Sequence, residues 1–458
     1  MRGWPHVMLG VRPFPFYGAP VTSSQNLYNA QITILFSPCG HTRPAWRNIM
    51  RILHTADWHL GRRLEGRSRH EEQEKVLDEI CRIVDDEAID AVIVAGDVFD
   101  AYNPPAESEA LFYRTMTRLS DGGRRAVVVI AGNHDSPDRL IASDPYARAL
   151  GITTIGYPKD VPALYDAGSS RVACIESSPS FIRLRLPESG ELLNVLALPY
   201  PSESRLRELL TAEVENEEQA SLNYNHRVRA FLDDCGRRFN PGQVNIIASH
   251  LFVAGGEECE SERQIQVGGL YTIDPASFPP SAGYVALGHL HRAQTMQGRE
   301  GVPVRYSGSI LQYSFSEAEQ QKSVTILEWN GADLTHTALP LSEGRTLRRW
   351  MIEGGLPELE HRLAETGRED LLSITVTLSD PPAPDYMSNL RRSHPGIVIC
   401  NSRYRQLVDE SGESLPELES LPLDEQFRRF VAERFNEPCS SEVLKLFLEL
   451  AAAGDESL

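Results

Sequence analysis

Several features that would assign this chain to a common protein class are missing from its sequence. No apolar run approaches the ~18–20 residues that a membrane span needs. The seven cysteines are scattered and form no C-x-x-C pair, so neither a disulfide framework nor a thiolate zinc site is expected. A reducing cytoplasm is therefore the natural compartment. The chain also lacks a G-x-x-x-x-G-K-[ST] loop, so we do not expect it to hydrolyse ATP itself.

Positive charge is scarce, with 45 lysines and arginines against 64 aspartates and glutamates and a formal net charge of −19. This balance argues at first against a nucleic-acid partner. Binding depends on local patches, however, and bound metal cations offset negative charge. The overall charge therefore excludes no partner.

The first 49 residues contain no acidic residue and no lysine, but they hold four arginines, six prolines and seven aromatic residues. Proline mixed with phenylalanine, without periodicity, predicts an irregular or disordered segment. Regular patterning begins only at Met50. We therefore expect residues 1–49 to be an extension that folding and activity do not require.

From Met50 onward, buried-strand patterns alternate with helical ones, which predicts an α/β sheet with parallel pairing. The first strands are ILHTAD, AVIVAGD and AVVVIAGNHD, separated by helices over residues 70–88 and 106–119. NVLALPY and a helical stretch over 202–238 follow. The later strands NIIASHL, YVALGHLH, VRYSGS and SVTILEW are close together and rich in β-branched residues, which favours antiparallel or mixed pairing. A two-sheet α/β sandwich flanked by helices accommodates both halves.

The chain then divides into smaller parts. A break near residues 340–348 is followed by a small βαβαβ unit over 345–404, and an acidic, proline- and serine-punctuated segment leads to two short helices. We expect four regions, which are an extension (1–49), a large α/β domain (50–340), a small α+β domain (345–404) and a tail with two helices (405–458).

Five predicted strands of the large domain end in side chains that can bind metal. They are Asp57 and His59, Asp97, Asn133 and His134, His250, and His289 and His291. Sites in open α/β sheets gather at the carboxyl ends of the strands, so these residues can converge. Side chains at i and i+2 of a strand point the same way, so the two D-x-H and H-x-H pairs would each offer two ligands to one side.

Imidazoles, carboxylates and one amide oxygen form a mixed nitrogen and oxygen set that suits manganese, iron or zinc better than calcium or magnesium alone. Asp97 could bridge two ions ~3.5–4 Å apart, the spacing of two-metal hydrolases, which activate a water and orient its attack on a phosphate. Taken singly, each residue has a simpler interpretation as a strand-end cap, and the glycines beside Asp97 and Asn133 can merely serve turns. The ordered set is hard to obtain by chance, and it predicts phosphoester hydrolysis.

The pattern DxH…GDxxD…GNHD…H…GHxH resembles that of the calcineurin-like metallophosphoesterases. Its flanks, MRILHTADWHLG, VAGDVFD, AGNHDSPDRL, ALGHLHRAQ and YSGSILQYSFSEA, are similar to those of the bacterial SbcD-type nucleases of the Mre family. The similarity covers roughly residues 50–458, and its motifs are most specific up to about Ser323.

The resemblance implies a role for each residue. Asp57, His59, Asp97 and His291 would hold one metal ion, and Asp97, Asn133, His250 and His289 the other. His134 would face the scissile phosphate and stabilise or protonate the leaving oxygen. Asp100 would hydrogen-bond to His134 and orient it.

Four arginines follow the first ligand pair and point toward DNA as the substrate. They are Arg62, Arg63, Arg67 and Arg69. A loop that starts beside the metals could track a phosphate backbone with these guanidinium groups. The alternative is that they pair with Glu65, Glu71 and Glu72.

The resemblance further implies a manganese-dependent DNA nuclease that works with a coiled-coil ATPase of the SbcC type. The chain would form a homodimer, and with the ATPase a heterotetramer with two copies of each subunit. Residues 345–404 would form a capping domain. The apolar stripes of the tail helices fit docking onto the ATPase. The expected activities are ATP-dependent 3′→5′ exonuclease cutting of duplex ends and endonuclease cutting of single strands and hairpins, in DNA repair, recombination and replication on the nucleoid. Two rivals remain, a stand-alone phosphodiesterase for small nucleotides and a non-catalytic scaffold that binds DNA ends.

Overall fold

The computed structural model describes residues 49–187, 190–201, 217–262, 272–367, 369–383, 385–404, 422–435, 439–441 and 443–447. The expectations for the N-terminal extension fall almost wholly outside these residues, as do those for the linker at 405–421. Within the described stretches, every helix is too short or too polar to cross a membrane.

One large sheet contains the strands predicted from ILHTAD, AVIVAGD and AVVVIAGNHD. Its described strands run in the order β16-β15-β1-β4-β5-β6. The four strands from β1 to β6 pair in parallel, and β15 and β16 add to the β1 edge in antiparallel fashion. The strand bounds are β1 Met50–Thr55, β4 Ala91–Ala95, β5 Ala126–Ile130, β6 Ile152–Ile155, β15 Ser323–Trp329 and β16 Leu334–Pro340.

A second large sheet has the described order β13-β14-β12-β11-β10-β9-β8-β7. Its bounds are β7 Tyr165–Asp166, β8 Ala173–Ser178, β9 Phe181–Arg185, β10 Leu192–Leu198, β11 Val244–His250, β12 Tyr284–Gly288, β13 Gln294–Gln297 and β14 Pro303–Tyr306. Strands β10, β11, β12 and β14 pair in parallel, and the other pairs are antiparallel.

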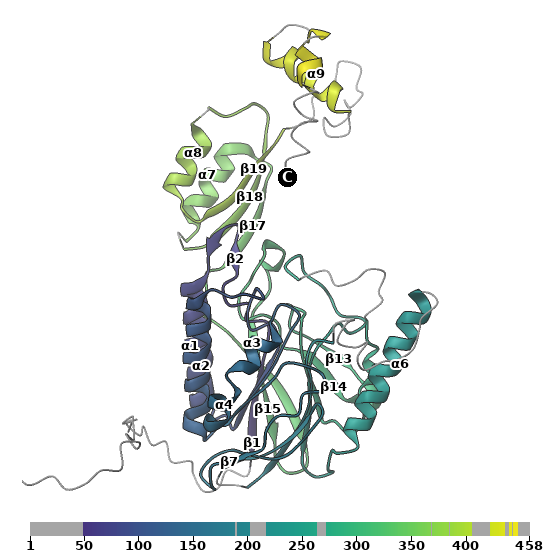
Figure 1. Ribbon diagram of the computed structural model, residues 1–458. Helices are drawn as coiled ribbons and strands as arrows, with labels where there is room; N and C mark the ends of the chain where they lie inside the picture. The colour runs from purple at the N-terminus through teal and green to yellow at the C-terminus, as the bar shows by residue number, and fades with distance from the viewer. Residues whose placement is uncertain are drawn as a thin grey trace, which may run out of the picture. The chain divides into compact units, whose positions relative to one another are not determined.

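The described helices are α1 His70–Asp86, α2 Ala106–Ser120, α3 Pro137–Ala142, α4 Asp144–Ala147, α6 Glu217–Gly236, α7 Gly355–Glu365, α8 Tyr386–Ser393 and α9 Leu423–Phe435. Helices α1 and α2 run side by side along the first sheet, and α6 covers the second (Figure 1). The predicted helix over 202–238 is described only from Glu217, because residues 202–216 lie outside the described stretches.

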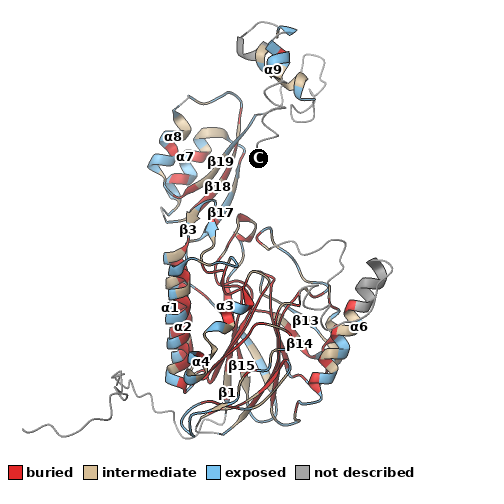
Figure 2. Ribbon diagram, in the orientation of Figure 1, coloured by how far each residue is buried: buried red, intermediate tan, exposed pale blue. Residues whose placement is uncertain are grey.

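The two sheets pack face to face, and both are buried on their outer faces as well. Successive residues of a strand point to opposite faces, so Ile52 of β1 packs against the second sheet, whereas Leu53 packs against the helices. On the second sheet, Ile246 faces the sandwich, and Ile247 packs with Leu232 of α6. Figure 2 shows the strands of both sheets as mainly buried. Burial on both faces explains why these strands are apolar without alternation.

The later strands lie in mixed sheets, as expected, but their pairs with one another are parallel. The second sheet is mixed, but β11, β12 and β14 are parallel neighbours, and β15 crosses to the first sheet. Parallel neighbours need long connections, and residues 251–283 and 289–302 supply them. Neither β-branched composition nor closeness in the sequence distinguishes parallel from antiparallel pairing.

The small unit has the expected βαβαβ order. Strands β17 Leu347–Ile352, β18 Leu371–Leu378 and β19 Ile397–Tyr404 form a parallel sheet, with α7 and α8 as the connections. Alternate residues of β18 are buried, and Ile374 and Val376 pack with Leu359 of α7 in a separate core cluster. The unit therefore has a small core of its own.

A buried carboxylate joins the large domain to the segment that leads into this unit. Glu72 at the start of α1 accepts hydrogen bonds from the Arg69 guanidinium at 2.7 and 2.8 Å. It also accepts from the main chain and side chain of Arg345, at 2.9 Å and at 2.7 and 3.0 Å. Burial opposes ionisation of Glu72, but the two arginines outweigh it and hold the pKa of this carboxyl below its usual range.

Replacement of Glu72 with Gln is expected to lower the free energy of unfolding by about 3 kcal/mol, because it leaves the Arg69 charge buried without its partner. A group with a lowered pKa in the folded state stabilises the fold above its unfolded pKa and loses that effect as the pH falls. The difference from the wild type should therefore narrow below about pH 4. Urea unfolding measures both effects, with the exposed neighbour Glu71→Gln as control. Equal stabilities of the two variants would contradict the role of Glu72.

Candidate metal centre

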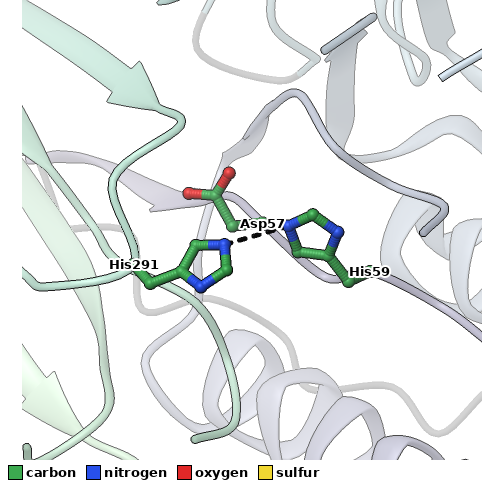
Figure 3. Close-up of side chains that lie close together, drawn as sticks. All are labelled: Asp57, His59 and His291. Atoms are coloured by element: carbon green, nitrogen blue, oxygen red, sulfur yellow. Dashed lines mark hydrogen bonds between the residues drawn. The ribbon is translucent and has the colours of Figure 1, made fainter. Parts of the chain in front are cut away.

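The predicted metal-binding side chains converge at the carboxyl ends of strands from both large sheets. Asp57 and His59 follow β1, and His291 follows β12 of the other sheet. Figure 3 shows the rings of His59 and His291 facing one another beside Asp57, with their Nε2 atoms 3.0 Å apart. All three residues are buried. The first predicted ligand group is therefore assembled from residues more than 230 positions apart.

Asp97 lies between this group and a second one. Its Oδ2 atom is 3.6 Å from His59 Nε2 and 3.4 Å from His250 Nε2. The side-chain oxygen of Asn133 is 2.9 Å from His250 Nε2 and 3.2 Å from His289 Nδ1. One carboxylate oxygen thus contacts histidines of both groups, which is the position that a bridging ligand requires.

Three sets of potential ligand atoms lie within 4.8 Å of one another among the described residues. They are Asp57–His59–His291, His59–Asp97–His134 and Asp57–Asp97–His250. The second set includes His134, so proximity alone does not separate this histidine from the ligands.

The backbone, rather than strand alternation, turns the ligands toward one side. Asp57, His59, Asp97 and His289 lie just beyond the strand ends and have positive φ angles of 54°, 43°, 49° and 112°. Such conformations cost of order 1–3 kcal/mol each and persist where the surroundings hold them, as at functional sites. The expected alignment of residues i and i+2 along a strand was therefore wrong in its geometry, although the side chains do converge.

Three glycines allow the ligand segments to approach closely. A Cβ atom on Gly132 would lie 2.0 Å from Asp97 Oδ1, and one on Gly96 would lie 2.3 Å from His250 Nδ1. A Cβ atom on Gly288 would lie 2.0 Å from the carbonyl oxygen of Ala95. The glycines of the GD and GNH motifs therefore do more than form turns, because a side chain at either position would collide with a predicted metal ligand.

The charges of the cluster fit a divalent ion. Burial lowers the pKa of His59 and of His289 to about 3, so both rings are neutral and can offer a lone pair. Burial also opposes a charge on His250, but the carboxylates of Asp97 and Asp57 outweigh it and raise its pKa to about 9. A ligand must be deprotonated, so an ion bound here would displace a proton from His250. This set of imidazoles, carboxylates and one amide suits manganese, iron or zinc.

His134 and Asp100 lie beside the cluster in an arrangement that differs from the expected one. The main-chain N–H of His134 donates to Asp97 Oδ1 at 2.9 Å, and its Nδ1 atom is 2.8 Å from the main-chain oxygen of Asp100. The Asp100 carboxylate instead lies 3.1 Å from the Arg62 guanidinium and 3.3 Å from His59 Nδ1. Asp100 therefore contacts His134 through its carbonyl group, while its carboxylate lies against Arg62 and His59.

Comparisons with known proteins agree with this architecture. The calcineurin-like phosphoesterase family matches residues 50–293, and the family described as "Type 5 capsule protein repressor C-terminal domain" (SbcD_C) matches residues 343–435. A protein of Bacillus subtilis (strain 168), named as the SbcD subunit of the nuclease SbcCD, is 43% identical over 413 residues, which are 89% of this chain and 99% of that protein. The chain belongs to the SbcD family of calcineurin-like phosphoesterases.

Two more distant relatives carry the same name. The Rhodobacter capsulatus protein is 37% identical over 82% of this chain and 85% of its own length. The Staphylococcus epidermidis protein is 26% identical over 82% of this chain and 91% of its own length. The two family models match parts of the large domain and of the small unit, and the predicted family and the calcineurin-like fold are confirmed.

The four arginines of this SbcD-family chain have different surroundings. Arg69 is buried and bound to Glu72, so it cannot reach a substrate, and its prediction as a DNA contact was wrong. Arg67 donates to the main-chain oxygens of Pro395 and Ile397, at 2.5 and 2.7 Å, and so contacts the small unit.

Arg62 and Arg63 have surroundings that are compatible with the predicted contact to DNA. Arg62 donates to Asp100 at 3.1 Å and to the main-chain oxygen of Ser261 at 2.6 Å. Its side chain is largely buried beside the metal-binding cluster. Arg63 is exposed in the β2–β3 hairpin (Arg63–Leu64 and Arg67–Ser68), where it donates to the Gly66 oxygen.

Sequence reasoning missed Asp135, which organises the loops of the SbcD-family site. Asp135 is fully buried and accepts hydrogen bonds from the main-chain N–H groups of Val98, Phe99 and Gly132 at 3.1, 2.9 and 2.8 Å. It therefore ties the loop after β4 to the loop after β5. Its place directly after the Asn-His pair of GNHD was the available signal.

Replacement of Gly132 with Ala is expected to displace Asp97 and to weaken manganese binding by about tenfold or more. The added methyl group would meet both the side chain and the main-chain nitrogen of Asp97, at 2.0 and 2.3 Å. Isothermal titration with Mn²⁺ measures the affinity, and circular dichroism checks the fold. Gly367→Ala is the control, because the nearest atom would lie 4.0 Å away. An unchanged Mn²⁺ affinity in Gly132→Ala would contradict the expected displacement of Asp97 from a ligand position.

Proposed function

We propose that this chain is the nuclease subunit of a SbcCD-type complex and hydrolyses DNA phosphodiesters with two divalent metal ions, with Mn²⁺ as the expected metal. The observation that carries the proposal is the position of Asp97, with one oxygen at 3.4–3.6 Å from histidines of two ligand groups. A single-ion site has no need of such a carboxylate. The names of the SbcD-family relatives, which contain the word nuclease, support a nucleic acid as the substrate.

The proposed ligands form two sets. Asp57, His59, Asp97 and His291 hold one ion, and Asp97, Asn133, His250 and His289 hold the other. When bound, the ions supply Lewis acidity for the phosphate oxygens and a water of lowered pKa as the nucleophile. The chain contributes the fixed orientation of the ligands, since His250 Nδ1 donates to the carbonyl oxygen of Ala95 at 2.9 Å and so presents Nε2 to the cluster.

His134 is proposed to act on the leaving group. Because the Asp100 carbonyl oxygen can only accept, the adjacent Nδ1 of His134 carries a proton, which leaves Nε2 for the substrate. In the doubly protonated ring, Nε2 donates a proton to the leaving oxygen as the P–O bond breaks. The main-chain contact of His134 to Asp97 fixes its distance from the metal cluster.

DNA is proposed to be held by Arg62 and Arg63 near the metals and to be selected by residues 345–404 as a capping domain. We place the large domain at 50–340 and the partner-binding tail at 405–458. Exonuclease cutting from 3′ to 5′ with ATP, endonuclease cutting of single strands and hairpins, and work in DNA repair, recombination and replication on the cytoplasmic nucleoid are parts of the same proposal.

Binding of a coiled-coil ATPase is assigned to the tail helices, in a heterotetramer with two copies of each subunit built on a homodimer of this chain. Phe427 of α9 stacks on Phe447 with ring centroids 3.8 Å apart, which pairs the two helical segments. Phe430 and Leu446 remain 53% and 58% exposed. Exposed apolar side chains on short paired helices suit recognition by a coiled coil.

Replacement of His134 with Ala is expected to reduce Mn²⁺-dependent cleavage of a hairpin oligonucleotide by about 10²–10⁴-fold, because the leaving oxygen loses its acid. Mn²⁺ affinity and DNA binding should stay within a factor of about three of the wild type, since the proposed ligands are untouched. Rates are measured with and without the ATPase partner, and the exposed histidine variant His361→Ala is the control.

The same assay separates the rivals. Undiminished cleavage by His134→Ala contradicts the role of this histidine. Hydrolysis of small nucleotides alone would favour a stand-alone phosphodiesterase, and DNA binding without any cleavage by the wild type would favour a scaffold.

Deletion of residues 423–458 is expected to abolish co-purification with the ATPase partner, because it removes the apolar helices. The point variant Phe430→Asp should weaken the complex by at least about tenfold, since an aspartate would be desolvated in an apolar interface. Arg428→Gln, on the same helix, is the matched control. Retention of the complex by the deleted chain would place the docking surface elsewhere.

A further inference from the structure

His291 makes hydrogen bonds through its main-chain N–H, its main-chain oxygen and its ring. Its main-chain N–H donates to Glu262 Oε1 at 2.6 Å, and its main-chain oxygen accepts from Lys322 Nζ at 2.8 Å. The ring nitrogen that points away from His59 is Nδ1, and it lies 2.7 Å from the hydroxyl oxygen of Ser261. Both backbone groups and the ring are therefore fixed.

The contacts behind the ring close on themselves. The Ser261 hydroxyl donates to Glu317 Oε1 at 2.5 Å, and Lys322 Nζ donates to Glu317 Oε2 at 2.5 Å. Since Lys322 also binds the carbonyl oxygen of His291, the four residues form a ring of hydrogen bonds around one imidazole. All four are at most 7% exposed. Buried polar networks of this kind rigidify only when every member is satisfied.

The identity of each donor follows from chemistry. Glu317 faces the Lys322 ammonium and the main-chain N–H groups of Tyr313 and Ser314, both at 3.1 Å, so its carboxylate only accepts. The single hydroxyl proton of Ser261 goes to the carboxylate, which is a stronger acceptor than a neutral ring nitrogen. The Ser261 oxygen then accepts the Nδ1–H of His291. This leaves the lone pair of His291 on Nε2, toward His59.

We propose that Ser261 and Glu317, braced by Lys322, are positioning residues that fix the tautomer and orientation of His291 so that Nε2 faces the metal centre. The inference rests on the proposed function, because it treats His291 as a ligand. Unlike the proposed ligands, Ser261 and Glu317 do not lie at or just after the end of a described strand. Glu317 is instead held by the capping box of the short 3₁₀ helix Phe315–Glu317, where Ser314 is the cap.

The test uses the full chain without metal, labelled with ¹⁵N at histidine. In the wild type the His291 ring, assigned by its absence from His291→Gln, should show a protonated Nδ1 and an unprotonated Nε2. Ser261→Ala should lose this fixed tautomer and bind Mn²⁺ about 10–100-fold more weakly by titration. Ser261→Thr keeps the hydroxyl and should restore both. Ser277→Ala removes an equally buried hydroxyl outside the network and should change neither.

Several outcomes would overturn the inference. It fails if Ser261→Ala keeps both the tautomer and the Mn²⁺ affinity, or if folded Ser261→Thr behaves like Ser261→Ala, which would indicate packing alone. If Ser261→Ala does not fold, Glu317→Gln, which keeps the shape of the side chain, is held to the same two measurements. Both readouts are free of DNA, so a wild type that binds Mn²⁺ but cuts no DNA would overturn the proposed function and leave this inference standing.

Discussion

A hydrogen bond between the two large sheets sets the distance on which the metal centre depends. His250 at the end of β11 donates from Nδ1 to the carbonyl oxygen of Ala95 at the end of β4, over 2.9 Å. Gly96 and Gly288 flank this contact, and a Cβ atom on either would lie 2.3 Å or less from one of its two atoms. The sheets can therefore meet at their carboxyl edges. Each sheet by itself carries only part of the ligand set.

The sequence predicted most elements of the large domain and the metal-ligand side chains that converge at the site. It did so because the strands are buried on both faces, and because ligand-type residues follow strand ends in a fixed order. The parallel pairing of β11, β12 and β14 was less accessible, since it depends on the path of residues 251–283 and 289–302 and not on strand composition. The positive φ angles of residues such as Asp57 and His59 likewise arise from tertiary contacts.

The polar groups around the ligands were the hardest to predict. Arg69 and Arg63 are close in the sequence, yet one is buried on Glu72 and the other is exposed. Both carry the same charge near the same ligand pair. They differ in burial because Arg69 lies next to Glu72 at the start of α1. Ser261 and Asp135 look ordinary in the sequence, because their importance comes from the atoms that they contact in three dimensions.

The separation of the ligands along the chain has a consequence for how the protein is made. Asp57 and His59 are synthesised early, but His291, whose ring lies against that of His59, comes 232 residues later. Contacts between such distant residues form late, because the intervening loop must first be closed at an entropic cost. A nascent chain that has formed only strands β1, β4, β5 and β6 can offer an ion no more than an incomplete set of ligands, because His250, His289 and His291 follow later strands. Metal capture is therefore coupled to the pairing of β12 with β11, which brings His289 and His291 to the other ligands late in folding.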